Sequence, residues 1–207
     1  MSNTPAAELP ATHHNVHPGV RIGHVHLRVA DLNRALSFYS GVLGFQITQR
    51  IGSQAAFLSV GGYHHHIGLN TWDSLNGPRP ELGATGLYHF ALLYPERSAL
   101  ADALYRLIEA SVALDGASDH GVSEALYLCD PDGNGVELSW DRPVEEWPRN
   151  HAGELAMFTK PLDLKSLLAA RHQGASRHAA IHSVGAHSIP GASDRATLKT
   201  GTRSSAG

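Results

Sequence analysis

Hydrophobic and polar residues alternate over residues 22–29, which predicts a half-buried strand. One face carries Val25, Leu27 and Val29, and the other carries His24, His26 and Arg28. Asp31 then stands at the position of a helix N-cap, and apolar residues follow at helical spacing, at Leu32, Leu36, Tyr39 and Leu43, before Gly44 ends the helix. Two more strands are predicted over residues 56–60 and 64–69, joined by a turn at Gly61 and Gly62.

The second half of the chain repeats this order. Residues 87–93 predict a strand with His89 and Ala91 on one face, and Pro95 opens a helix with an apolar stripe formed by Leu100, Leu104, Leu107 and Ile108. Strands at 125–129 and 135–140 are separated by a turn at 130–134. His24 and His89 lie 65 residues apart (89 − 24), and that offset superposes the two halves. The pattern therefore predicts an α+β fold of two tandem βαβββ modules that form a cup-shaped mixed sheet with the helices outside.

Composition separates a central domain from its flanking segments. Residues 1–19 and 171–207 are rich in small, polar and His residues without periodicity, so both are predicted to be disordered. The domain is expected over residues 20–141, with modules at about 20–75 and 85–141. An extension over residues 142–170 contains a short amphipathic helix at 162–168. That helix either caps the cup, packs on a partner subunit or seals a sheet edge.

Charge and cysteine content exclude several function classes. Lys and Arg number 16 against 19 Asp and Glu, so binding to nucleic acid or to a membrane surface has no electrostatic support. Cys129 is the only cysteine, which excludes an internal disulfide and a thiolate zinc cluster. No signal peptide is visible, and no apolar run approaches the ~20 residues that span a bilayer. We therefore expect a cytoplasmic protein.

Three residues form a candidate metal site. His24 and His89 occupy equivalent positions in the two modules, and Glu137 lies on the last strand between Val136 and Leu138, which face the other way. If the sheets form one cup, all three side chains point into it. Two neutral imidazoles and one carboxylate, with further positions open, suit Fe(II) and leave room for substrate and dioxygen. A buried glutamate also needs a partner that offsets its desolvation, and a metal supplies one.

Two motifs carry a resemblance to a known family. The opening motif runs from His24 through Asp31 and Leu32, with Phe38, Tyr39 and the Leu-Gly-Phe of residues 43–45. It resembles the first module of the vicinal-oxygen-chelate superfamily, which includes glyoxalase I, bleomycin-resistance proteins and type I extradiol dioxygenases. The second motif, His-Gly-Val-Ser at 120–123 followed by residues 127–134 and Glu137, resembles the extradiol, catechol 2,3-dioxygenase branch.

The resemblance implies roles for six residues. His24, His89 and Glu137 match the metal ligands, His120 and Tyr127 match groups near the metal, and His65 is the closest match to the acid–base histidine. The three consecutive histidines at 64–66 leave the register open, because a slip of one residue reverses the face and would place His64 or His66 in the site.

The function implied is an extradiol ring-cleaving dioxygenase. Such an enzyme uses Fe(II), with Mn(II) as the alternative metal, and acts on an aromatic diol and O2; we also expect a homo-oligomer. Two other functions stay open: a glyoxalase I-type isomerase or lyase, and a non-catalytic binding protein of the bleomycin-resistance kind. Gly68 stands where glyoxalase I has a fourth ligand, and glycine offers no side chain to coordinate with, so the dioxygenase is favoured.

Overall fold

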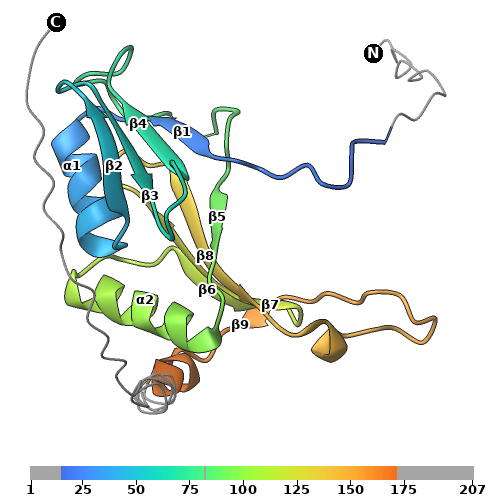
Figure 1. Cartoon of the computed structure of the whole chain (residues 1–207). Coiled ribbons are helices and arrows are strands. Elements are labelled where there is room, and N and C mark those ends of the chain that lie inside the picture. The colour runs from blue at the N-terminus through green and yellow to red at the C-terminus, as the bar shows by residue number, and fades with distance from the viewer. Residues whose placement is uncertain (1–14, 82, 172–207) are drawn as a thin grey trace, which may run out of the picture.

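A computed structural model describes residues 15–81 and 83–171 (Figure 1). The first module contains a four-stranded sheet in the order β1-β4-β3-β2. Its strands are β1 (Val25–Arg28), β2 (Gln46–Ile51), β3 (Ala55–Ser59) and β4 (Ile67–Asn70). Strand β1 pairs in parallel with β4, whereas the other pairs are antiparallel. The helix α1 (Leu32–Leu36) continues into η1 (Ser37–Val42), which has π-helical geometry.

The second module repeats this arrangement in a five-stranded sheet with the order β5-β8-β7-β6-β9. Its elements are β5 (Phe90–Leu93), α2 (Arg97–Glu109), β6 (Gly116–Asp119), β7 (Ser123–Cys129), β8 (Gly135–Asp141) and β9 (Lys160–Pro161). Strand β5 pairs in parallel with β8, as β1 does with β4. The α+β fold of two βαβββ modules is therefore confirmed, and its strands form two mixed sheets, not a closed barrel.

Several predicted local features are confirmed. The carboxylate of Asp31 accepts hydrogen bonds from the N–H groups of Asn33 and Arg34, which makes it the N-cap of α1. Gly44 has a φ of +87°, the left-handed geometry of a residue that ends a helix. Gly61 and Gly62 also have positive φ, as their turn requires. Strands β2 and β6 had no explicit counterpart among the predicted strands.

Three strands begin later than their sequence patterns predict. Strand β1 begins at Val25 instead of residue 22, β4 at Ile67 instead of 64, and β5 at Phe90 instead of 87. The reason is pairing: Val25 is opposite Ile67, and Phe90 is opposite Val136, so neither parallel pair extends further toward the N-terminus. As a result His24 and His89 both lie immediately before their strands, again in equivalent positions.

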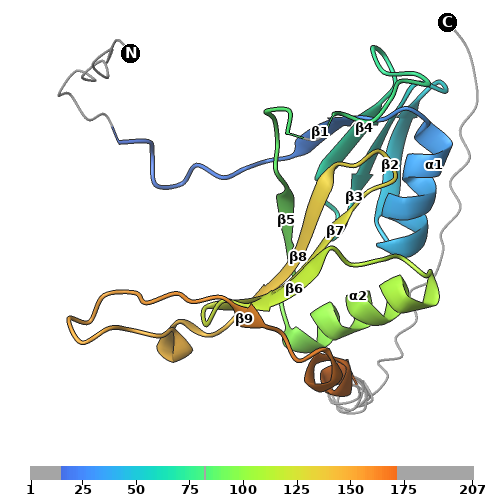
Figure 2. The same cartoon turned by 180° about the vertical axis from the view of Figure 1, so that it is seen from behind.

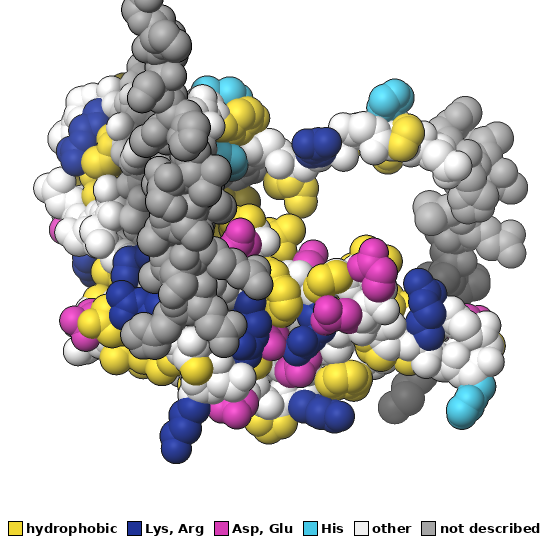
Figure 3. All heavy atoms as spheres, turned by 60° about the horizontal axis from the view of Figure 1, so that its bottom comes forward, with side chains coloured by type: hydrophobic (Ala, Val, Ile, Leu, Met, Phe, Trp, Pro, Cys, Tyr) yellow, Lys and Arg dark blue, Asp and Glu magenta, His cyan; other side chains and the backbone are white. Residues whose placement is uncertain are grey.

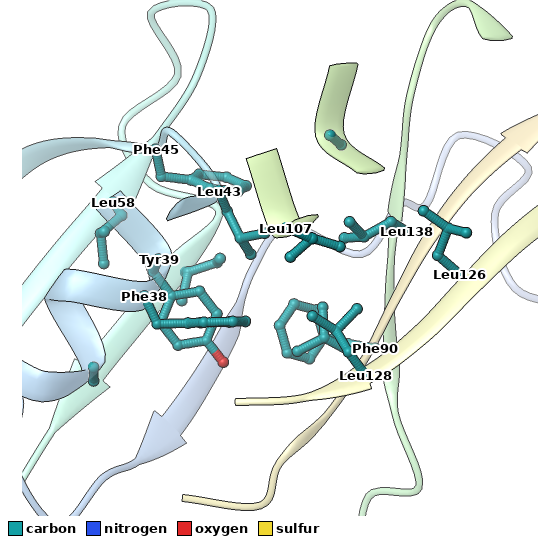
Figure 4. Close-up of a cluster of buried hydrophobic side chains, with 14 of the residues drawn as sticks. Phe38, Tyr39, Leu43, Phe45, Leu58, Phe90, Leu107, Leu126, Leu128 and Leu138 are labelled. Atoms are coloured by element: carbon teal, nitrogen blue, oxygen red, sulfur yellow. The ribbon is translucent and has the colours of Figure 1, made fainter. Parts of the chain in front are cut away.

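The two modules share one hydrophobic core (Figure 4). Phe38, Tyr39 and Leu43 from the first module face Phe90, Leu107, Leu128 and Leu138 from the second. The rings of Tyr39 and Phe90 stack with their centroids 6.5 Å apart. Burial of these side chains at the helix-covered side holds the modules together and leaves the opposite face of each sheet free of helices.

Polar contacts also join the two modules, at the junction formed by this shared core. The Tyr39 hydroxyl donates to Asp130 Oδ2 at 2.9 Å, and Asp132 Oδ1 accepts from Arg34 Nη2 at 2.6 Å and from the Ala30 N–H at 3.1 Å. Asp130 and Asp132 belong to the turn between β7 and β8, so this turn connects the second module to the first. Because these groups are buried or half-buried, the contacts restrict how the modules can move relative to each other.

The extension after β8 seals a sheet edge. It contains the short helix η2 (Val144–Glu146) and strand β9, which pairs with β6 at the edge of the second sheet. A last helix, from residue 164 to residue 171, buries Leu167 and Ala170, and Arg171 Nε bonds Asp102 at 2.8 Å. Of the two predicted disordered ends, only residues 15–19 and 171 are described, and the rest lies outside the described residues.

Two segments project from the same side of the molecule (Figures 1 and 2). One is residues 15–24, which we call the N-terminal arm, and the other is residues 142–159, the β8–β9 arm. Exposed apolar side chains on them include Val20, Ile22, Val144, Leu155 and Met157. In the part of the chain that the structure describes, no helix has the length and hydrophobicity needed to span a bilayer.

Candidate functional site

Two predicted ligands meet on the second sheet. His89 Nε2 lies 2.9 Å from Glu137 Oε2, and the two side chains are 31% and 14% exposed. Glu137 is opposite Ala91 of β5 and Tyr127 of β7, so it stands in the middle of the helix-free face. A Cβ at Gly135 would collide with the carbonyl oxygen of Tyr88 and lie 3.0 Å from the Cβ of His89. Glycine at 135 therefore allows the chain carrying His89 to lie directly against β8.

Tyr127 and His120 extend this pair into a row of polar groups. The Tyr127 hydroxyl lies 2.8 Å from His120 Nε2 and 3.4 Å from Glu137 Oε1. Burial, followed by the charge of Glu137, raises the pKa of Tyr127, so its hydroxyl keeps its proton at neutral pH. A single phenolic proton can serve only one of its two neighbours at a time. The row His120–Tyr127–Glu137 is therefore a path along which a proton can shift.

Residues outside the predicted site hold His120 in place. Its Nδ1 lies 3.2 Å from Thr159 Oγ1 and 3.3 Å from the Phe158 carbonyl oxygen. Both residues stand at the end of the β8–β9 arm. The Gly121 N–H bonds Asp119 Oδ1 at 2.8 Å, and Gly121 has a φ of +77°, which shapes the turn after His120. Sequence reasoning missed Thr159, because it follows His120 by 39 residues and belongs to no motif.

The remaining predicted residues lie in the first module, just before the strands β1 and β4. The rings of His24 and His65 have centroids 4.4 Å apart, and His65 Nδ1 lies 2.7 Å from His64 Nδ1. A hollow of about 380 Å³ beside them is lined by Thr48, Gln49, Phe57, His64 and His65. Desolvation, then the neighbouring His24 and His64, lowers the pKa of His65, which favours a neutral ring. Of the three consecutive histidines, His65 is the one in ring contact with His24.

The six predicted site residues therefore fall into two groups. His89, Glu137, Tyr127 and His120 form the group on the second sheet, which we call half-site B, and His24 and His65 form half-site A. Within residues 15–81 and 83–171, no three His, Cys, Asp or Glu side chains are gathered closely enough to hold a metal ion. One chain thus brings two of the three predicted ligands together. Coordination of the metal by His24 stays a prediction.

The position predicted to lack a fourth ligand is filled by a neighbour. Gly68 on β4 is opposite His26 on β1, and a Cβ at Gly68 would lie 3.0 Å from the imidazole ring of His26. A side chain at this position would therefore require the His26 ring to shift, whereas the glycine seen here lets the ring lie directly over β4.

Comparison with known proteins agrees with this architecture. The family model of the Glyoxalase/Bleomycin resistance protein/Dioxygenase superfamily matches residues 21–138. A catechol-2,3-dioxygenase of Bacillus subtilis is 44% identical over 154 residues, which cover 74% of this chain and 53% of that protein. The chain thus spans about half the length of this relative. Biphenyl-2,3-diol 1,2-dioxygenase 3 of Rhodococcus globerulus is 30% identical over 67% of this chain and 74% of its own length.

A solved structure shows the same fold at lower identity. The crystal structure of a glyoxalase/dioxygenase from Nostoc punctiforme superposes with a TM-score of 0.51 and 21% identity, covering 62% of this chain and 97% of that one. The family model covers both modules, including the opening strand and the strand of Glu137. The chain belongs to the glyoxalase/bleomycin resistance protein/dioxygenase superfamily.

Proposed function

We propose that the protein is a metal-dependent extradiol dioxygenase that cleaves a catechol-type aromatic ring with O2. The observation that carries the proposal is half-site B, in which an imidazole, a carboxylate, a phenol and a second imidazole stand in contact on one open sheet face. The relatives named catechol-2,3-dioxygenase and biphenyl-2,3-diol 1,2-dioxygenase support the same reaction class.

The donor atoms of half-site B suit a divalent metal. Two ligands that each lie about 2.1 Å from one ion at a right angle are about 3.0 Å apart, and the atoms of His89 and Glu137 are separated by 2.9 Å. One imidazole and one carboxylate match the preference of Fe(II), and Mn(II) has a similar preference. We assign His89 and Glu137 as ligands, with His24 as the third. When bound, the metal would lower the pKa of the diol hydroxyls and bring diol and dioxygen together.

His120 and Tyr127 are proposed to handle protons. The Tyr127 hydroxyl can donate to His120 Nε2, and His120 Nδ1 is held by the oxygen atoms of Thr159 and Phe158. This arrangement lets His120 Nε2 take up a proton from the Tyr127 hydroxyl and return it without moving its ring. His65 is proposed as the acid–base histidine, because its neutral ring is ready to accept a proton from a diol hydroxyl.

Small and aromatic side chains share the sheet face of Glu137. Ala91 on β5 is paired with Glu137, and Ala125 on β7 is paired with Ser139 two positions along β8, while the larger Tyr127 and Leu93 lie on the same face. Tyr88, whose ring centroid lies 5.4 Å from that of His89, is 89% exposed and offers an aromatic surface at the border. An aromatic diol would match this combination of aromatic and apolar surface with polar anchors.

The experiment is reconstitution with Fe(II) under anaerobic conditions, followed by air-saturated assays with a panel of catechols. We expect oxygen uptake equal to the catechol consumed and a new yellow product, and no reaction without oxygen. Glu109→Gln, which changes an exposed carboxylate at the end of α2, is the matched control for Glu137→Gln. Absence of oxygen uptake with every catechol, despite bound Fe(II), would refute the proposed reaction.

A further inference from the structure

The position of His120 depends on its backbone more than on the contacts of its ring. His120 is half-buried, and its Nδ1 contacts two oxygen atoms at 3.2 and 3.3 Å, which are long hydrogen bonds. The backbone is held at shorter distances. The His120 N–H donates to the Ser123 carbonyl at 2.9 Å, and the N–H of the buried Gly121 donates to Asp119 Oδ1 at 2.8 Å. A group that fixes Asp119 therefore also fixes the direction in which the His120 ring leaves the chain.

Arg142 is the group that fixes Asp119. Asp119 on β6 and Glu124 on β7 are directly opposite each other, and like charges in such positions repel. Arg142 Nη2 lies 3.0 Å from Asp119 Oδ2 and 2.9 Å from Glu124 Oε1, so one guanidinium compensates both carboxylates. Glu124, which is 3% exposed, has a second cation in Arg97 at 2.8 Å. Within the described part of the chain Asp119 has one ion pair, to Arg142, and its orientation depends on it.

The β8–β9 arm encloses the same turn from both of its ends. At its start, the Arg142 N–H donates to the Val122 carbonyl at 2.8 Å, and at its end the Phe158 N–H donates to the His120 carbonyl at 3.3 Å. A Cβ at Gly121 would lie 2.6 Å from the ring of Phe158, so the arm lies directly against the turn. Figure 3 shows acidic and basic side chains close together where this arm leaves the body of the molecule.

We propose, on the basis of the function proposed above, that Asp119 and Arg142 are positioning residues for proton transfer by His120. Arg142 holds one oxygen of the Asp119 carboxylate, and the other oxygen accepts from the Gly121 N–H. The turn fixed in this way places His120 Nε2 2.8 Å from the Tyr127 hydroxyl. Both residues act through the backbone of the turn. Misplacement of a reacting group by about 1 Å can cost about 10²-fold in rate, so their loss should slow the reaction of a protein that still folds.

Substitutions at Asp119 give the sharpest test. Asp119→Ala removes the acceptor of the Gly121 N–H, whereas Asp119→Asn keeps an oxygen at that place and removes the charge. Both also remove the repulsion between Asp119 and Glu124, which favours a folded variant. Asp102→Ala is the matched control, because Asp102 on α2 forms an ion pair of 2.8 Å with Arg171 and takes no part in the turn.

The first readout needs no metal. Solvent exchange of the Gly121 N–H is measured by NMR on the metal-free protein, together with the ring signals of His120, which are assigned by their absence in His120→Asn. In Asp119→Ala we expect Gly121 to exchange at least about 10-fold faster and the His120 ring signals to shift. Asp119→Asn should be intermediate, and Asp102→Ala should match the wild type. Unchanged His120 signals in Asp119→Ala would overturn the proposal, because the carboxylate would then not position the ring.

The second readout is a double-mutant cycle on the Fe(II)-reconstituted enzyme. Asp119→Ala should lower kcat by about 10–100-fold with little change in the KM for catechol, because His120 moves a proton and does not hold the diol. In the His120→Asn background the same substitution should have little further effect, since its route of action is gone. Additive losses would show a merely structural role and overturn the proposal. A wild type that takes up no oxygen with any catechol would refute the proposed dioxygenase, and the ring signals alone would then decide whether Asp119 positions His120.

The part of Arg142 is tested by a second pair of variants. Arg142→Gln removes the cation and should slow the reaction and release the Gly121 N–H, as Asp119→Ala does. Arg142→Lys keeps a cation beside the two carboxylates and should restore most of the rate. Circular dichroism and thermal melting show whether each variant is folded, and rates are compared per folded, metal-loaded protein. Equal kcat in the wild type, Arg142→Lys and Arg142→Gln would overturn the positioning role of Arg142.

Discussion

Replacing Tyr39 by Phe should weaken the junction between the modules without opening a cavity. The phenylalanine ring fills the same fully buried position, so the change removes only the hydroxyl that donates to Asp130 Oδ2 at 2.9 Å. Hydrogen bonds to charged groups contribute about 1.5–3 kcal/mol. Asp130 keeps its bonds from the Asn134 side chain and from the N–H groups of Asp132 and Asn134, which limits the penalty. We expect the free energy of unfolding to fall by about 2 kcal/mol.

Urea and thermal unfolding of the two proteins measure this loss. For a chain of this size, about 2 kcal/mol lowers Tm by roughly 4–8 °C. Tyr63→Phe is the matched control, because Tyr63 is 41% exposed and its hydroxyl makes no hydrogen bond to another described residue. An equal loss in both variants, or less than about 0.5 kcal/mol in Tyr39→Phe, would show that the hydroxyl does not stabilise the junction.

The pH dependence of stability gives an independent signature of the same hydroxyl. Burial, followed by the charge of Asp130, raises the pKa of Tyr39 far above its ordinary value of 10.0. A group with a raised folded-state pKa contributes stability below its unfolded pKa and loses it as the pH rises. The wild type should therefore lose stability above about pH 10 more steeply than Tyr39→Phe. Parallel curves for the two proteins between pH 9 and 11 would contradict this reasoning.

Three further predictions concern half-site B. Glu137→Gln should remove most of the Fe(II) affinity, because the only anionic ligand is lost, whereas Glu109→Gln should retain the metal in elemental analysis. His120→Asn should keep the metal and bind catechol but react about 10²–10⁴ times more slowly, and an unchanged rate in steady-state assays would exclude a role in proton transfer. Gly135→Ala should displace His89 and lower metal content, whereas Gly116→Ala, with its nearest neighbour 3.9 Å away, should not.

The sequence pattern located the strands and helices well because each module satisfies its own hydrophobic periodicity. Strand alternation placed His24 and His89 at equivalent positions within the opening strands; the structure keeps the equivalence but places both residues just before β1 and β5. Glu137 lies on β8, as expected. It overestimated the length of β1 and β5, since a strand ends where its partner ends, and the partner's position is not a property of the local sequence. The contacts of Thr159 and Phe158 with His120 could not be predicted for a related reason, because both residues belong to a segment that is distant from His120 in the sequence.

The relative placement of the modules could not be predicted from periodicity, although the candidate site depends on it. An internal duplication specifies two similar sheets, each with one apolar and one polar face, and several arrangements bury the apolar faces equally well. The choice is made by individual contacts, such as Tyr39 with Asp130 and Arg34 with Asp132, which join a helix of one module to a turn of the other. The sequence identifies residues 130–134 only as a turn, whereas in the structure Asp130 and Asp132 of this turn bond residues of the first module. Ligand types and strand faces follow from the local sequence, whereas the position of His24 relative to Glu137 depends on how the two modules pack against each other.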